Sequence, residues 1–72
     1  MILSISEQIR LITRRAGLSL SDIAAATGQS RQNLANKLRR DNFTVKELQR
    51  IAAAAGCSVS IVWTDKDGKP LL

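Results

Sequence analysis

Four side chains near the middle of the chain carry hydrogen-bonding groups that suit the edges of DNA bases. They are Arg31, Gln32, Asn33 and Asn36. An arginine can donate two hydrogen bonds to O6 and N7 of a guanine, and a glutamine or asparagine amide can pair with N6 and N7 of an adenine. If one helix carries these residues, its surface is suited to reading sequence in the DNA major groove.

Two short helices joined by a tight turn are predicted around these residues. The run SLSDIAAATGQSRQNLANKL, residues 19–38, begins with small and apolar residues, has Gly28 at the turn and continues with polar residues after Ser30. Ser30 is a favourable N-cap for the second helix. A packed helix followed across a tight turn by a polar one is the layout of a helix-turn-helix, whose second helix enters the major groove.

In total, helices are predicted at about residues 5–16, 20–27, 31–40 and 45–55, because the sequence marks their ends. Three of them begin with a hydroxyl three residues before an acid, the capping-box spacing. These pairs are Ser4 with Glu7, Ser19 with Asp22, and Thr44 with Glu47. Glycines at positions 17, 28 and 56 follow three of the helices, where a left-handed residue often ends a helix.

Apolar residues at helical spacing predict the core of the domain. They are Ile5, Ile9, Ile12, Ala16, Ile23, Ala24, Leu34, Leu38, Val45, Leu48, Ile51, Ala52 and Ala55. Phe43, in the loop before the fourth helix, is expected to pack between the third and fourth helices. Leu11 and Leu20 fit the pattern less well, so each is expected either at a partner contact or on the surface.

After Gly56 the spacing of apolar residues changes from helical to alternating, which predicts a β-strand. Asp67-Gly68 is a hairpin-turn sequence, and residues 69–72 are expected to return as an edge strand because Pro70 cannot donate a ladder hydrogen bond. An isolated hairpin is only marginally stable, so pairing either with Met1–Leu3 or with a second subunit is expected. The residues predicted to make this contact are Val59, Ile61, Val62 and Trp63.

Length and charge narrow the class of protein. A chain of 72 residues makes one domain, and its net charge of +5 favours a polyanionic partner, either nucleic acid or an anionic membrane surface. A single phenylalanine and a single tryptophan are too few aromatic rings for a platform that stacks single-stranded bases. No predicted helix combines a basic face with a large aromatic and aliphatic one, which argues against the membrane surface.

Several chemistries are excluded by what the sequence lacks. Without histidine and with one cysteine, the chain offers no zinc site, no histidine-based triad and no intramolecular disulfide. It has no paired carboxylates, activated nucleophile or phosphate-binding glycine loop, so we expect neither enzymatic activity nor a cofactor. Its apolar runs are too short to span a bilayer and its start lacks signal-peptide features, so a cytoplasmic protein is expected.

On these motifs, the chain resembles the phage-repressor (Cro/Xre-like) family of helix-turn-helix domains. The resemblance extends from Ile9 to about Ala55 and rests on Ile23-Ala24, Gly28, Ser30-Arg31-Gln32, Leu34 and the fourth-helix sequence LQRIAAAAGC. The segment SRQNLANKLRRDNFT is similar to a subgroup whose third helix runs directly into an Asn-Phe loop. The resemblance implies a regulator that binds operator DNA, usually as a dimer, with its second helix across the groove and its third helix inside it.

Applied to this chain, the resemblance assigns base-edge contacts to Arg31, Gln32 and Asn36, with Asn33 next. Residues expected at the DNA backbone are Ser30, Lys37, Arg39, Arg40, Arg10, Arg14 and Asn42. The chain departs from the family pattern at three positions: Gln29 and Lys37 stand where many members have an apolar residue, and Leu20 stands where a glutamine often touches a phosphate.

The sequence therefore predicts a mainly α fold, a four-helix repressor-like helix-turn-helix domain with a short C-terminal β-strand or hairpin. Residues 1–56 are expected to form the DNA-binding part and residues 57–72 a dimerisation element of the same domain. We expect a homodimer, because one recognition helix reads too few base pairs for a specific site and two helices about 34 Å apart suit a pseudo-palindrome. The alternative is a protein-interaction module on the same fold, such as an antitoxin or anti-repressor subunit.

Overall fold

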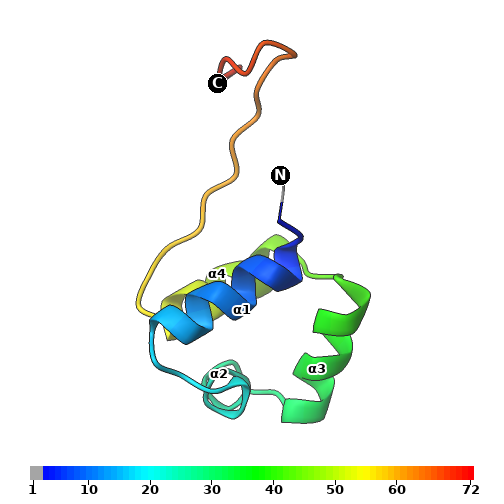
Figure 1. Ribbon diagram of the computed structural model, residues 1–72, viewed down its shortest axis with the longest axis vertical. Helices are drawn as coiled ribbons and strands as arrows, with labels where there is room; N and C mark the ends of the chain where they lie inside the picture. The colour runs from blue at the N-terminus through cyan, green and yellow to red at the C-terminus, as the bar shows by residue number, and fades with distance from the viewer. Residues whose placement is uncertain (1–2) are drawn as a thin grey trace.

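The computed structural model describes residues 3–72 and is mainly helical (Figure 1). The helices are α1 (Ile5–Arg15), α2 (Leu20–Ala26), α3 (Arg31–Arg40) and α4 (Val45–Ala54). Each predicted helix is present and its bounds agree with the prediction to within a residue. Helix α2 packs against both α3 and α4, while α1 lies alongside α4. No helix among the described residues has the length and apolar character that a membrane span requires.

Capping explains where the helices begin. All three predicted capping boxes form: the hydroxyl of the N-cap accepts the backbone N–H of the acid, and the acid side chain accepts the N–H of the N-cap. Ser30 caps α3 in the same way, since its Oγ accepts the backbone N–H of Asn33 at 3.0 Å. Each of these bonds satisfies a backbone donor that the first turn of a helix leaves without a partner.

The core lies where α2, α3 and α4 meet the inner face of α1. Its buried apolar residues are Ile9, Ile23, Ala24, Leu34, Leu38, Ile51 and Ala52. Leu18, Leu20, Phe43, Leu48, Ala54 and Ala55 are half-buried against it. Leu20, which the sequence pattern left either at a partner contact or on the surface, therefore packs partly against the core.

The predicted core was too large on one side. Ile5, Ile12, Ala16 and Val45 are exposed, although their spacing matches the helical stripes. Short helices of this size bury a narrow stripe, and the outer edges of α1 and α4 have no further helix to cover them. Leu11, which fitted the stripe poorly, is half exposed at 50 %.

The predicted C-terminal strand is not formed, which corrects the sequence-based expectation. Residues 57–63 run away from the four helices as an extended segment (Figure 1), and residues 58–62 make no backbone hydrogen bond within the described chain. A strand is stabilised by ladder hydrogen bonds to a neighbour, and within the described residues the chain supplies none along this segment. The predicted pairing with Met1–Leu3 falls mainly on residues 1–2, which lie outside the described part of the chain.

Only the tip of the predicted hairpin is present, as one antiparallel bridge between Thr64 and Pro70. The hydrogen bonds flank the bridge: Leu71 N–H donates to the Trp63 carbonyl and Asp65 N–H donates to the Lys69 carbonyl, both at 2.8 Å. Pro70 therefore occupies a position where no N–H is needed. Gly68, at a φ of 83°, makes the turn that the Asp67-Gly68 sequence predicts.

Candidate nucleic-acid interface

The start of α3 is fixed by the turn that joins it to α2. Gly28 has a φ of 71°, a left-handed conformation that glycine adopts without strain. The next residue closes the turn, because the Gln29 N–H donates to the Ala24 carbonyl at 3.0 Å. This short connection holds α3 against α2 and leaves Ser30, Arg31 and Gln32 exposed at the first turn of α3.

Gln32, Asn36 and Arg39 form one polar stripe along α3. Their spacing of four and three residues places them on one face of the helix. Two hydrogen bonds join them, since Gln32 Nε2 donates to Asn36 Oδ1 at 3.4 Å and Arg39 Nη2 donates to the same oxygen. The structure thus brings two predicted base-edge residues together with Arg39, which the sequence placed at the DNA backbone.

Asn33 and Lys37 occupy a different stripe of α3, next to α4. Asn33 Nδ2 donates to Gln29 Oε1 at 3.2 Å, and Gln29 Nε2 donates to Thr27 Oγ1 at 2.8 Å. With Glu47 and Arg50 of α4 these side chains surround a polar cavity of about 240 Å³. Gln29, the first departure from the family pattern, therefore fills its position with an amide that hydrogen-bonds on both sides.

Lys37 is paired with an acid on the neighbouring helix. Its Nζ lies 3.1 Å from Glu47 Oε1, and this is the one ion pair within residues 3–72. The hydrogen bond from Lys37 stabilises the charged carboxylate, so the pKa of Glu47 lies below its ordinary value. Sequence reasoning expected Lys37 at a phosphate and Glu47 only as a cap, because their separation along the chain gives no helical spacing that would reveal the pair.

The C-terminal end of α3 is fastened to the N-terminal end of α1. Ser6 is buried there and its Oγ donates to the Leu38 carbonyl at 2.6 Å. Asp41, which ends α3 in a left-handed conformation with a φ of 55°, accepts from the Ser6 N–H at 2.7 Å. Asp41 Oδ1 also lies 2.9 Å from Ser6 Oγ, so the single hydroxyl proton is shared between this oxygen and the Leu38 carbonyl. Neither residue was predicted for this contact, because their pairing depends on how the two helices pack.

The remaining residues predicted to contact the DNA backbone lie in two exposed places. Arg40 and Asn42 lie at the end of α3, where the Asn42 N–H donates to the Lys37 carbonyl at 3.3 Å. Arg10 and Arg14 follow one edge of α1, beside Leu18 and Leu20 at the start of α2.

Asp22, also at the start of α2, has a pKa below its ordinary value because it accepts hydrogen bonds from Ser19.

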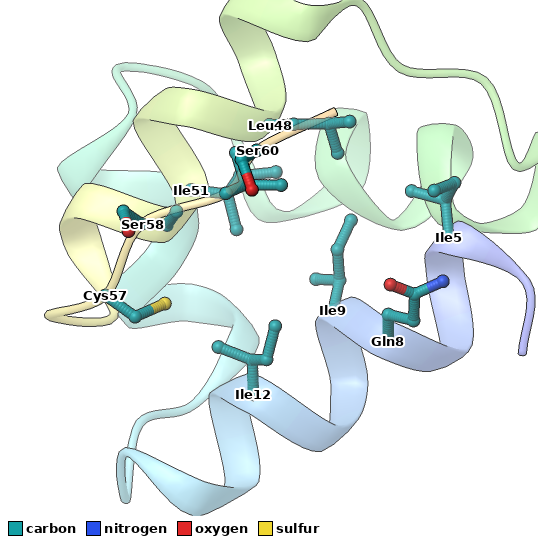
Figure 2. A pocket seen from close by; sticks show the side chains of 11 residues that line it. Ile5, Gln8, Ile9, Ile12, Leu48, Ile51, Cys57, Ser58 and Ser60 are labelled. Atoms are coloured by element: carbon teal, nitrogen blue, oxygen red, sulfur yellow. The ribbon is translucent and has the colours of Figure 1, made fainter. Parts of the chain in front are cut away.

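A second surface lies between α1 and α4, away from the exposed stripe of α3. Figure 2 shows Ile5, Ile9 and Ile12 of α1 facing Leu48 and Ile51 of α4 across a cavity of about 250 Å³. Residues 57–60 pass along its rim, so the C-terminal segment borders this apolar groove. The side chains beyond it stay exposed, at 55 % for Ile61 and 65 % each for Val62 and Trp63, and Val59 is 39 % exposed.

Comparisons of the chain with family models, with curated proteins and with solved structures give no match.

Proposed function

We propose that this chain is a sequence-specific DNA-binding transcriptional regulator, a repressor, that reads the major groove with α3. The observation that carries the proposal is the exposed face of α3, which presents Arg31, Gln32, Asn36 and Arg39 beyond a tight turn from the packed helix α2. These side chains suit base edges, while Ser30 at the helix N-terminus suits a phosphate. The four helices are compatible with the helix-turn-helix domain of the phage-repressor (Cro/Xre-like) family, and such a regulator would act in the cytoplasm.

Charge supports the same interpretation. The chain carries a net charge of +5, and Arg31, Arg39 and Arg40 are exposed on or at the ends of α3. Asp41, the acid nearest to them in the sequence, is engaged with Ser6. Exposed cations near a groove-reading helix would neutralise phosphates and release counterions, which provides much of the affinity for DNA.

We further propose that the protein binds as a homodimer through residues 57–63. Val59, Ile61, Val62 and Trp63 are exposed, and the backbone of residues 58–62 makes no hydrogen bond within the described chain. An open apolar edge of this kind favours pairing with another strand, and the same segment of a second copy would supply one. The dimer would present two α3 helices to a two-fold symmetric operator.

The test is a selection of binding sites from a library of random DNA duplexes, performed with the natural chain and with the double variant Arg31→Ala/Gln32→Ala. We expect an enriched, two-fold symmetric motif that the double variant loses. Arg15→Ala/Gln49→Ala is the matched control, because it removes the same charge and the same amide from exposed positions on α1 and α4 and should leave the motif unchanged. Equal loss of the motif in both double variants would contradict readout by α3.

Measuring DNA binding at several salt concentrations distinguishes the proposed regulator from the alternative function, a protein-interaction module. Weak, motif-free binding that falls steeply with salt and ignores Arg31→Ala/Gln32→Ala would indicate charge attraction alone. The exposed apolar residues of the C-terminal segment would then favour a protein-interaction module, such as an antitoxin or anti-repressor subunit.

A further inference from the structure

The amide of Asn36 is constrained within the polar stripe of α3. Its Oδ1 accepts two hydrogen bonds, one from Gln32 Nε2 at 3.4 Å and one from a guanidinium nitrogen of Arg39. Asn36 is half-buried, whereas Gln32 and Arg39 are exposed. An amide oxygen has two lone pairs, so both acceptor positions of Asn36 are taken by neighbours on its own helix.

This arrangement leaves Asn36 with its Nδ2 group to offer to DNA. The guanidinium of Arg39 fixes which side of the Asn36 amide is oxygen, because arginine only donates and a reversed amide would place donor against donor. Asn36 thus presents N–H groups at the surface of α3. Gln32 differs, since its Oε1 stays available within the stripe while one of its N–H groups is directed to Asn36.

We propose that Arg39 is a positioning residue that determines which base Asn36 reads, by keeping the Asn36 amide as a donor. The proposal rests on the function proposed above. A full asparagine–adenine pair needs the amide oxygen to accept from adenine N6. With that oxygen engaged, Asn36 favours base edges that only accept, namely O6 and N7 of guanine or O4 of thymine.

Arginine is suited to this role because its planar fork can bond to Asn36 and still present other N–H groups. From the sequence, Arg39 is expected only at a phosphate, where it would add affinity without base preference. The two roles differ in one measurable respect. Loss of a phosphate contact weakens binding to all sites about equally, whereas release of Asn36 changes the preferred base at one position.

The first experiment compares base preferences of the natural chain, Arg39→Met and Arg40→Met in the duplex selection. Methionine keeps an unbranched stem and removes the charge. Both variants should lose affinity and reduce the magnitude of the salt slope by about 0.9. Only Arg39→Met should move one position of the motif toward adenine, by about fivefold or more. An unchanged preference in Arg39→Met, or the same change in Arg40→Met, would overturn the proposal.

A double-mutant cycle that combines Asn36→Ala with Arg39→Met identifies which of the two residues contacts the base. Asn36→Ala should lose the preference at that position, and adding Arg39→Met to it should change base preference no further. If Arg39→Met still alters the preferred base when residue 36 is alanine, Arg39 reads the base itself and the positioning role is wrong.

A measurement without DNA separates this proposal from the function on which it rests. In the free protein, the side-chain carbonyl and amide NMR signals of Asn36 should shift in Arg39→Met and stay in place in Arg40→Met. An unchanged signal in Arg39→Met overturns the hydrogen bond to Asn36 whatever the DNA result. A shifted signal together with no selected motif would instead overturn the DNA-reading function, and the base-preference proposal with it.

Discussion

Ser6 illustrates how much one small side chain contributes in a domain of this size. It is buried between α1 and α3, and its hydroxyl donates to the Leu38 carbonyl while its N–H is accepted by Asp41. Serine is an ordinary residue for the second position of a capped helix, so this role could not be predicted from the sequence. The contact arises only once the ends of α1 and α3 are brought together.

We therefore expect Ser6→Ala to lower the free energy of unfolding by about 1–3 kcal/mol, because it leaves acceptors at the buried α1–α3 contact without the hydroxyl. Urea denaturation followed by circular dichroism measures the change. Ser21→Ala is the control, since Ser21 is exposed on α2 and should change stability by no more than about 0.5 kcal/mol. Equal effects of the two substitutions would show that the hydroxyl of Ser6 contributes little.

The ion pair between Lys37 and Glu47 gives a pH-dependent contribution whose sign follows from the lowered pKa of Glu47. A carboxyl group with a lower pKa in the folded state stabilises the fold above its unfolded pKa, about 4.3. That stabilisation is lost as the pH falls through the folded value. Lys37→Met should raise the pKa of Glu47 and reduce this part of the pH dependence. An NMR titration of the Glu47 carboxyl in the natural chain and in Lys37→Met measures this pKa. An unchanged pKa of Glu47 in Lys37→Met would contradict the pairing.

At the scale of helices, the sequence predicts where each helix begins and ends but not the side-chain contacts between two helices. The capping boxes and the glycines at positions 17, 28 and 56 marked most helix ends, because each signal lies within a few residues of the end it sets. The end of α3 carried no glycine, and Asp41 takes the left-handed position instead. The pairing of Lys37 with Glu47 joins α3 to α4, so no helical period predicts it.

If the chain binds DNA as proposed, the contact between α3 and α4 reduces the charge that Lys37 can offer to a phosphate. Lys37 is paired with Glu47, so its charge is partly compensated in the free protein. We expect Glu47→Gln to release Lys37, strengthen binding at low salt and increase the magnitude of the salt slope by up to about 0.9, the value for one added phosphate contact. Fluorescence anisotropy with a labelled duplex at several salt concentrations measures both quantities.

Glu7→Gln is a closely matched control for that measurement. Glu7 and Glu47 are both the acid of a capping box, in α1 and α4 respectively, and both substitutions remove one negative charge. Only Glu47 is paired with a lysine of α3. If the two variants change the salt slope equally, the effect is one of net charge and Lys37 is not restrained by its partner.

At the scale of the whole molecule, the helical part and the C-terminal segment differ in how far sequence determines structure. The core residues on α2 and α3, such as Ile23 and Leu34, were predictable because helical spacing and burial coincide there. The alternation after Gly56 predicted a strand, yet a strand needs a neighbour as well as a pattern. Residues 57–63 have the alternating pattern, but residues 58–62 have no neighbouring strand within the described chain.

If a second copy supplies that neighbour, the oligomeric state should depend on residues 57–63 while the helices do not. Ile61→Lys places a charge on the apolar edge of a segment that lies outside the core, so the helical circular dichroism should be unchanged and the dimer weakened. Size-exclusion chromatography with light scattering at tens of micromolar measures the mass. Leu72→Lys, a fully exposed apolar residue beyond the alternating segment, is the control.

Fluorescence of Trp63 measures the monomer–dimer equilibrium independently, because Trp63 is the single tryptophan of the chain and is 65 % exposed. Its emission should move to shorter wavelength as the natural chain is concentrated, and Ile61→Lys should shift that change to higher concentration. A natural chain that elutes as a monomer, with emission independent of concentration, would contradict the dimer. It would also limit the protein to one recognition helix, so a two-fold symmetric motif would no longer be expected in the library selection.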